Sequence, residues 1–365
     1  MNNHVTVLEI NGEAIDHNLN YFKRKLRPET KILAVVKAFG YGSDSVQVSS
    51  FLKDKIAYFA VAYSHEGVAL RKANITTPIL VLHPQVQNFD QIIQYQLEPS
   101  IYNFKTLTTF KTHVIKQKKI AYPIHLKFNT GLNRLGFSKD NLHEVLNIIL
   151  ETQSLKIQSV FSHLAASEDS NEQEFTNKQL DNFKAIVKQV YNSLDYKPII
   201  HALNTSGVIN YPEAQYDMVR IGIGLYGFGN TKKETSQLKN SHILKSIISQ
   251  MHTIKAGESV GYNRAFIANK KTRIATIPIG HADGISRKLG NGIGNVTINN
   301  QKTTILGNVC MDMIMVDISN IDCKEGDEVF IFKTQEDILS IASITKTISY
   351  EVLNLISQRV KRLLK

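Results

Sequence analysis

The chain has 365 residues, of which 42% are hydrophobic and 21% are charged, as expected for a globular protein with room for two domains. No stretch approaches the ~20 apolar residues of a membrane-spanning helix, and the segment Met1–Ile15 lacks the apolar region of a secretory signal. The net charge of +11 comes from scattered Lys and Arg without a nucleic-acid-binding motif, so we expect neither a membrane nor a nucleic-acid partner.

The chain has only two cysteines, Cys310 and Cys323, which are too few for a disulfide framework. Neither has other ligands at metal-binding spacing, so we predict no metal site. Free thiols are typical of a reducing compartment, and we therefore expect a cytoplasmic protein.

Residues 31–229 alternate short apolar segments with amphipathic segments of helical periodicity. Strands are predicted at Ile32–Lys37, Tyr58–Tyr63, Pro78–His83, Leu97–Tyr102, Ile124–Phe128, Ile157–His163, Ile199–Leu203 and Met218–Tyr226. Helices are predicted at Ala14–Leu26, Ser43–Lys55, Ser64–Ala73, Val86–Tyr95, Thr106–Lys119, Asn141–Glu151 and Glu172–Ser193. Eight strands linked in this way predict an α/β fold of the (β/α)8 barrel type. A doubly wound sheet is the alternative, but the turn after the first strand lacks the G-x-G-x-x-G dinucleotide motif.

After Asn230 the pattern changes to a polar link, Thr231–Ser241, followed by short strands without helices between them. These strands are predicted at Ile247–Ile254, Arg273–Ile279, Asn295–Ile298, Thr303–Leu306, Met313–Asp317 and Glu328–Phe332. A final helix is predicted at Asp337–Leu364, and Val5–Ile10 is a candidate strand of the second domain. We therefore expect a barrel domain of residues 1–230, with 1–12 as a possible contribution to the other domain. Residues 231–365 would form a mainly β domain with a C-terminal helix.

Lys37 stands at the end of the first predicted barrel strand and precedes the turn Gly40-Tyr41-Gly42. Active sites of barrel enzymes lie at the C-terminal ends of the strands, where the amine of Lys37 would emerge. A partly desolvated amine at a rigid strand end suits a Schiff base with an aldehyde cofactor such as pyridoxal phosphate. Taken alone, the residue also fits a lysine that reaches solvent.

Polar residues and glycines follow the other predicted strands and would converge on the same end of the barrel. Hydroxyl groups and glycines after the seventh and eighth strands are suited to a phosphate group. A serine or threonine there is also a common helix N-cap, so the combination with Lys37 carries the prediction. The residues are Tyr41, Arg134, His163, Thr205, Ser206, Arg220, Gly222 and Ile223.

An ordered set of motifs extends over almost the whole chain. The motifs are Ala34-Val35-Val36-Lys37-Ala38 with Tyr41-Gly42, then the segments 125–137, 161–165, 201–205, 219–227, 256–262, 278–284, 307–312 and 349–353. Together they resemble the alanine racemases, which are pyridoxal 5'-phosphate enzymes with a barrel and a β domain. The resemblance implies an isomerase that interconverts L-alanine and D-alanine and so supplies D-alanine for peptidoglycan.

The resemblance also implies residue roles. Lys37 would hold the cofactor as a Schiff base and act as one acid/base, and Tyr262 from the second subunit of a homodimer would be the other. His163 would contact Tyr262 and Arg220, and Arg220 would face the ring nitrogen without protonating it. The cofactor phosphate and ring would be held by Tyr41, Thr205, Arg220, Gly222, Ile223 and Tyr350. The substrate would be held by Arg134 and Met311. Lys127 matches a lysine that is carbamylated in some members.

The chain departs from the family pattern mainly around the expected access corridor. Phe39, Gly40, Ser43 and Asp44 replace Asn, Ala, His and Gly, while His281 replaces a tyrosine and Asn308 an arginine. None of these changes removes a catalytic group, but they leave the substrate breadth open, and a broad-spectrum amino-acid racemase is an alternative.

Two further alternatives carry less support from the residues. A decarboxylase of the same architecture would use a cysteine and an aspartate, for which Cys310 and Asp312 are candidates, but Val260–Tyr262 favours racemisation. A non-catalytic cofactor carrier would be a barrel alone, and the long segment after Asn230 argues against it.

Overall fold

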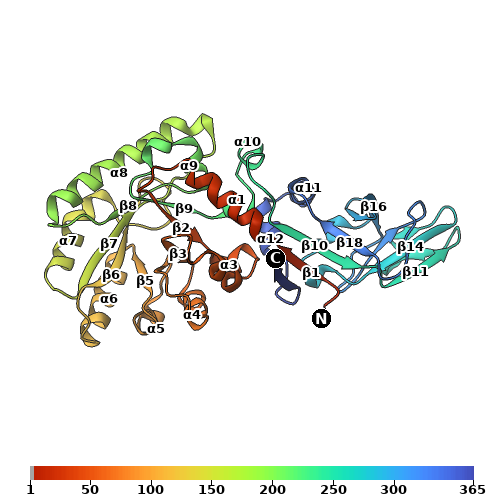
Figure 1. Cartoon of the computed structure of the whole chain (residues 1–365), viewed down its shortest axis with the longest axis horizontal. Coiled ribbons are helices and arrows are strands. Elements are labelled where there is room, and N and C mark those ends of the chain that lie inside the picture. Colours follow the sequence, from red (N-terminus) through yellow and green to blue (C-terminus); the bar gives the residue numbers. More distant parts are fainter. Residues whose placement is uncertain (1–3) are drawn as a thin grey trace.

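A computed structural model describes residues 4–365, which form a barrel lobe and a β lobe lying side by side along the long axis of the molecule (Figure 1). The barrel lobe contains an eight-stranded parallel sheet in the order β8-β7-β6-β5-β4-β3-β2-β9. The strands are β2 Lys31–Val35, β3 Tyr58–Val61, β4 Ile79–Val81, β5 Glu98–Ile101, β6 Tyr122–Lys127, β7 Leu155–Phe161, β8 Ile199–His201 and β9 Met218–Ile221. The predicted fold is confirmed.

The barrel closes between β8 and β9 through single hydrogen bonds rather than a regular ladder. The backbone N–H of Arg220 donates to the carbonyl of Leu203 at 3.0 Å, and that of Asp217 to the carbonyl of Ile200 at 3.1 Å. Every residue of β3, β4 and β9 is buried, as expected for parallel strands that are covered on both faces.

Helices cover the outside of the barrel (Figure 1). Asn11 and Asn103 cap two of them, because each side chain accepts a backbone N–H of the first turn, from Ala14 and Thr106 respectively. The helices of this lobe are α1 Gly12–Lys23, α2 Lys37–Tyr41, α3 Ser45–Leu52, α4 Ser64–Lys72, α5 Phe89–Gln94, α6 Phe104–Lys116, α7 Leu142–Leu150, α8 Gln173–Ser193 and α9 Thr205–Asn210.

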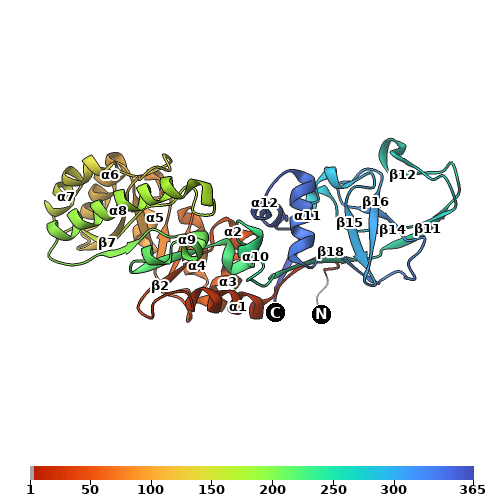
Figure 2. The same cartoon turned by 90° about the horizontal axis from the view of Figure 1, so that it is seen from above.

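The β lobe, on the right in Figure 2, is built on a nine-stranded sheet, whose order is β11-β14-β17-β16-β15-β18-β10-β1-β19. Its strands are β1 Val7–Ile10, β10 His242–Ile247, β11 Gln250–Ile254, β14 Thr272–Ile277, β15 Asn295–Ile298, β16 Gln301–Leu306, β17 Ile314–Asp317, β18 Glu328–Phe332 and β19 Lys361–Leu364. Two further strands, β12 Ser259–Val260 and β13 Phe266–Ile267, form a separate hairpin, and α10 Lys232–Thr235 lies in the link between the lobes. One continuous apolar core joins both lobes.

The N-terminal strand β1 pairs with strands of the β lobe. β1 pairs antiparallel with β10 and parallel with β19, so it lies inside the nine-stranded sheet. The prediction for residues 1–12 includes residues 1–3, which lie outside the described residues. Within residues 4–365, no helix combines the length and the apolar character needed to span a membrane.

The predicted C-terminal helix Asp337–Leu364 is wrong. The segment forms α11 Gln335–Thr345 and α12 Ser349–Asn354 and then the edge strand β19. Lys346 adopts a left-handed conformation with φ of 59° and ends α11. Arg362 is buried, and its guanidinium donates to the carbonyls of Gly42, Ile356 and Val360, which keeps this part of the chain out of a helix.

Candidate active site

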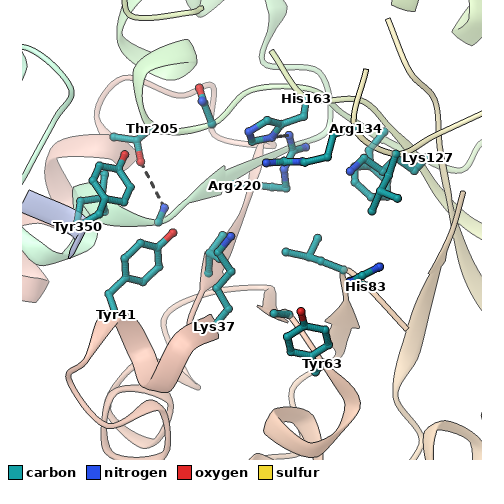
Figure 3. A pocket seen from close by; sticks show the side chains of 18 of the residues that line it. Lys37, Tyr41, Tyr63, His83, Lys127, Arg134, His163, Thr205, Arg220 and Tyr350 are labelled. Carbon is teal, nitrogen blue, oxygen red and sulfur yellow. Dashed lines mark hydrogen bonds between the residues drawn. The ribbon is translucent and has the colours of Figure 1, made fainter. Parts of the chain in front are cut away.

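A cavity of about 530 Å³ lies at the C-terminal ends of the barrel strands (Figure 3). Ten of the residues predicted for the site line it: Lys37, Tyr41, Lys127, Arg134, His163, Thr205, Arg220, Gly222, Ile223 and Tyr350. Nine come from the barrel lobe, and Tyr350 comes from α12 of the β lobe. The strand-end argument therefore predicts the position of this cavity.

Lys37 begins a backbone turn of unusual hand. Ala38, Phe39, Gly40 and Tyr41 have φ values of 53°, 55°, 65° and 54°, and Gly42 follows at 83°. The left-handed region costs roughly 1–2 kcal/mol for each residue that has a side chain. Such strain is typical of functional sites, where the surrounding structure enforces it.

The carboxylate of Glu66 supports this turn. Glu66 lies in the first turn of α4. Its Oε1 accepts a hydrogen bond from the backbone N–H of Ala38 at 2.6 Å, and its Oε2 accepts from those of Ala62 and Tyr63 at 2.6 and 3.1 Å. Burial and the neighbouring Arg134 lower the pKa of the Lys37 amine. A lowered pKa raises the fraction of free amine, the form that reacts with an aldehyde.

Tyr41, Thr205 and Tyr350 bring three hydroxyl groups to one end of the cavity, beside Gly222 (Figure 3). The hydroxyl of Thr205 accepts the backbone N–H groups of Gly222 and Gly224 at 3.3 and 3.4 Å. A side chain at Gly222 would overlap the hydroxyl of Tyr41, so only glycine lets that hydroxyl approach the backbone. Asn230 orients Tyr350, because its side-chain oxygen accepts a hydrogen bond from the Tyr350 hydroxyl at 2.8 Å.

Arg220 and His163 form a pair at the centre of the cavity (Figure 3). The guanidinium donates to Nδ1 of His163 at 3.2 Å and to the carbonyls of Ser162 and Ala202 at 2.8 and 2.7 Å. Burial lowers the pKa of Arg220 to about 9, so the group stays charged at neutral pH. Burial, and then the charge of Arg220, lower the pKa of His163 well below its usual value, so its ring is neutral.

Lys127 and Arg134 complete the basic side of the cavity. Lys127 is buried, and its amine lies 5.7 Å from the ring centroid of Phe161. Burial and the charges of Arg134, Arg220 and Lys37 lower its pKa to about 8. Among the described residues, none of these four cations forms an ion pair with a side chain, and no Asp or Glu lines the cavity.

The residues present fit pyridoxal phosphate. The cradle of hydroxyls around Gly222 offers donors to a phosphate, and Lys37 offers an amine to an aldehyde. The basic groups of the cavity have no ion-pair partner among the described residues, so they favour anionic ligands, which a phosphate and a substrate carboxylate would supply.

Tyr262 and Met311, predicted for the same site, lie elsewhere. They line a second cavity of about 440 Å³ on the β lobe, together with Gly261, Cys310, Asp312 and Met313. The side chains are 73% and 59% exposed, respectively. The hairpin strand β12, which precedes Tyr262, lies at the end of the β lobe away from the barrel (Figure 2). One chain therefore does not bring Tyr262 to Lys37.

Sequence reasoning missed several residues that line the first cavity, among them Tyr63, His83 and Asn230. Tyr63 and His83 end the second and third predicted strands, so the argument used for Lys37 applied to them as well. Their rings lie 5.7 Å apart between centroids. Asn230 comes after the last barrel strand, and no motif in the sequence marks it as a cavity residue.

The residues that depart from the family pattern have structural roles. The amide of Asn308 donates to the carbonyl of Tyr262 at 3.1 Å and accepts the side-chain amide of Asn291 at 3.2 Å, which orients the Tyr262 backbone. The Arg362 guanidinium packs over Phe39, 5.4 Å from the ring centroid. Asp44 has φ of 73° and caps α3 by accepting the backbone N–H groups of Val46 and Gln47.

Comparisons with known proteins agree along the whole chain. Residues 10–229 match the alanine racemase N-terminal domain, and residues 242–364 match its C-terminal domain. The chain is 33% identical over 370 residues to an alanine racemase of Helicobacter pylori, covering 97% of each sequence. It superimposes on the alanine racemase of Clostridium difficile with a TM-score of 0.95 at 32% identity, covering 100% and 97% of the two chains. An alanine racemase of Bartonella henselae with covalently bound pyridoxal phosphate gives a TM-score of 0.86 at 29% identity, covering 99% and 100%. The chain therefore belongs to the alanine racemases, isomerases that depend on pyridoxal phosphate.

Proposed function

We propose that this racemase moves the α-proton of alanine between two bases on opposite faces of the bound substrate, the Lys37 amine and the Tyr262 phenol. The lowered pKa of Lys37, in a cavity rich in cations, is the observation that carries the proposal. Racemisation removes a proton from one face and returns one to the other, so a base on each face is the simplest arrangement. The product, D-alanine, would serve peptidoglycan synthesis.

Pyridoxal phosphate, when bound, acidifies the Cα–H bond of the amino acid by withdrawing electrons from it. Lys37 would hold the cofactor, and Tyr41, Thr205, Gly222, Ile223 and Tyr350 would bind its phosphate. Arg220 would meet the ring nitrogen. Since a guanidinium keeps its protons near neutral pH, Arg220 would not protonate that nitrogen, and the weaker electron withdrawal would limit side reactions.

The substrate carboxylate would bind Arg134 and the backbone N–H of Met311. Lys127 would carry a carbamate, whose negative charge would hold Arg134 in place and balance part of the basic cluster. Its lowered pKa supports this, because only a neutral amine reacts with carbon dioxide.

We infer a homodimer with two composite sites, because Tyr262 and Met311 are exposed on the β lobe while Lys37 faces the barrel cavity. In a dimer with twofold symmetry, the β lobe of each subunit would cover the barrel cavity of the other. Covering the cavity would also exclude water from the reacting groups. Because Nδ1 of the neutral His163 ring accepts from Arg220, its Nε2–H would then donate a hydrogen bond to the phenol oxygen of Tyr262.

We further propose a cytoplasmic protein divided into a barrel domain of residues 1–230 and a β domain of residues 231–365 that also takes in β1. The two free cysteines support the location, and the sheet order supports the division.

The experiment is a racemisation assay on the purified protein with added pyridoxal phosphate, using a panel of L-amino acids. Alanine is the expected substrate, and turnover of serine or others would establish the breadth that His281 and Asn308 leave open. Borohydride reduction followed by peptide mass analysis should find the cofactor on Lys37. Carbon dioxide release from a basic amino acid without alanine racemisation would instead identify a decarboxylase.

A further inference from the structure

A row of polar side chains crosses five neighbouring strands of the barrel, one from each strand, and all of them except the partly exposed Glu98 are buried. The row begins at Glu98 on β5 and continues through His125 on β6, Ser159 on β7 and His201 on β8 to Arg220 on β9. The successive contacts measure 2.7, 2.6, 2.9 and 2.8 Å. His125, Ser159 and His201 have no exposed surface, so water does not compete for these hydrogen bonds.

The chemistry of the two ends sets the direction of every hydrogen bond in the row. Arg220 can only donate, so Nδ1 of His201 must accept. Burial, and then the charge of Arg220, lower the pKa of His201 well below its usual value, so the ring is neutral and carries its proton on Nε2. That N–H donates to the hydroxyl of Ser159.

The remaining hydrogens follow in sequence. The Ser159 hydroxyl already accepts from His201, and its other hydrogen-bond partner among the described residues is Nδ1 of His125, to which it donates. His125 must therefore carry its proton on Nε2 and donate it to the Glu98 carboxylate, an acceptor when ionised. All donors thus point from Arg220 toward Glu98.

The reversed direction would disturb the cofactor side of the barrel. If residue 98 donated a hydrogen bond to His125, both histidines would have to change tautomer. A hydrogen on Nδ1 of His201 would then face the N–H of Arg220. Two donors at 2.8 Å repel, so the guanidinium would have to move. Ionised Glu98 prevents this because it has no hydrogen to donate.

We propose that Glu98 is a positioning residue for Arg220, which it orients through the fixed tautomers of His125 and His201. This inference rests on the proposed role of Arg220 toward the ring nitrogen. Glu98 is also the acidic end of the row, whereas Arg220 has no carboxylate in contact among the described residues. The row therefore links a buried cation to a carboxylate four strands away.

The test compares three variants labelled with ¹⁵N-histidine. Glu98→Gln keeps the size of the side chain but can donate, and Ser159→Ala interrupts the row while leaving both ends intact. Tyr58→Phe is the matched control, because the Tyr58 hydroxyl also donates to Glu98, at 3.2 Å, but lies outside the row. The ring nitrogen shifts report each tautomer, with assignments from His125→Asn and His201→Asn.

In the unchanged protein and in Tyr58→Phe we expect His201 protonated at Nε2 only, with or without pyridoxal phosphate. In Glu98→Gln and Ser159→Ala, protonation at Nδ1 should appear and kcat should fall on the order of tenfold with KM nearly unchanged. An unchanged His201 tautomer in both variants overturns the proposal, as does a changed tautomer with wild-type kcat. Absence of any racemase activity in the unchanged protein would instead refute the proposed function, while the tautomers in the cofactor-free protein still decide the role of Glu98.

Discussion

At the scale of single residues, the site is defined by basic side chains that have no ion-pair partner in the part of the chain that the structure describes. Burying a charged group is costly unless an opposite charge or hydrogen bonds compensate. Arg220 meets this requirement with carbonyls and histidines, whereas Lys127 has neither of these partners within residues 4–365. The lowered pKa of Lys127 reflects the cost of burying its charge. An anionic ligand, or a modification that removes the charge, would remove that cost.

Lys127 should therefore react with carbon dioxide. Because its pKa is lowered to about 8, the neutral amine increases as the pH rises through that value, and carbamate formation should increase with it. Protein equilibrated with ¹³C-bicarbonate should show a carbamate carbon signal that Lys127→Ala lacks. Lys127→Ala should also raise KM for alanine, since Arg134 would lose its proposed anchor. A signal that persists in Lys127→Ala would show that another amine is modified.

The residues of the site differ in how far the sequence could predict them. Lys37, Thr205 and Arg220 were predictable because barrel topology brings strand ends together wherever the strands lie in the sequence. The row from Glu98 to Arg220 was not, because a histidine inside an apolar strand looks the same whether it pairs or only packs. The position of Tyr262 relative to Lys37 was not predictable without the family resemblance, because in the proposed homodimer it would depend on a second chain.

At the scale of elements, the barrel strands were placed well and their ends less so, whereas the predicted strand Ile247–Ile254 spans the break between β10 and β11. The eighth strand was predicted to Tyr226 but ends at Ile221, because Gly222 turns the backbone away beside the Tyr41 hydroxyl. The predicted C-terminal helix failed because Arg362 finds buried carbonyls in the fold that helical periodicity does not reveal. In both places a tertiary contact overrides a local pattern.

Asp44, at the start of α3, combines a favourable cap with an unfavourable backbone. It adopts φ of 73° while its carboxylate accepts two backbone N–H groups. Asp44→Ala keeps the strain and loses the cap, so we expect a loss of about 1 kcal/mol or more in the free energy of unfolding. Asp44→Gly also loses the cap but relieves the strain, so it should be as stable as the parent or more so. Urea unfolding of the two variants measures the difference, and equal stability would contradict the assigned strain.

At the scale of the whole molecule, the two lobes are joined by buried polar contacts. His242, at the start of β10, has Nε2 at 2.6 Å from the hydroxyl of Ser43 in the barrel lobe and Nδ1 at 3.1 Å from that of Ser241. Arg362 of β19 donates to the carbonyl of Gly42 nearby. These bonds fix the lobes at the level of the left-handed turn that follows Lys37.

Acid should weaken this junction. Burial, and then the charge of Arg362, lower the pKa of His242 to about 3, whereas the unfolded chain would protonate near ~6.5. Between these values the unfolded state binds more protons, so stability falls as the pH drops below ~6.5, by up to ~1.4 kcal/mol per pH unit for this group. His163 and His201 act in the same direction. Unfolding measured from pH 7 to pH 5 should show a smaller slope for His242→Gln, and an identical slope would argue against burial of a neutral ring.

Subunit mixing tests the composite site. Lys37→Ala and Tyr262→Phe should each be nearly inactive, but after subunit exchange at equal amounts about a quarter of the activity should return. Half of the dimers are then mixed, and each holds one intact site. Mixing Lys37→Ala with Arg220→Ala is the control, because both changes lie in the barrel cavity and no mixed dimer has an intact site. Confirmed exchange without recovery in the first mixture would exclude a site shared between subunits.

The position of β1 has a consequence for the order in which the chain can fold. β1 lies between β10 and β19, so strands from residues 7–10 and 361–364 are neighbours, and the backbone N–H of Lys365 donates to the carbonyl of Ile10 at 2.9 Å. During synthesis, β1 is made long before β10 and β19, so the sheet is incomplete until both of these later strands have left the ribosome. A fragment beginning near residue 242 would lack that strand and expose the edge of β10, which invites pairing with other chains. The β lobe thus combines residues 7–10 with strands between residues 242 and 364 and cannot be excised as one continuous piece.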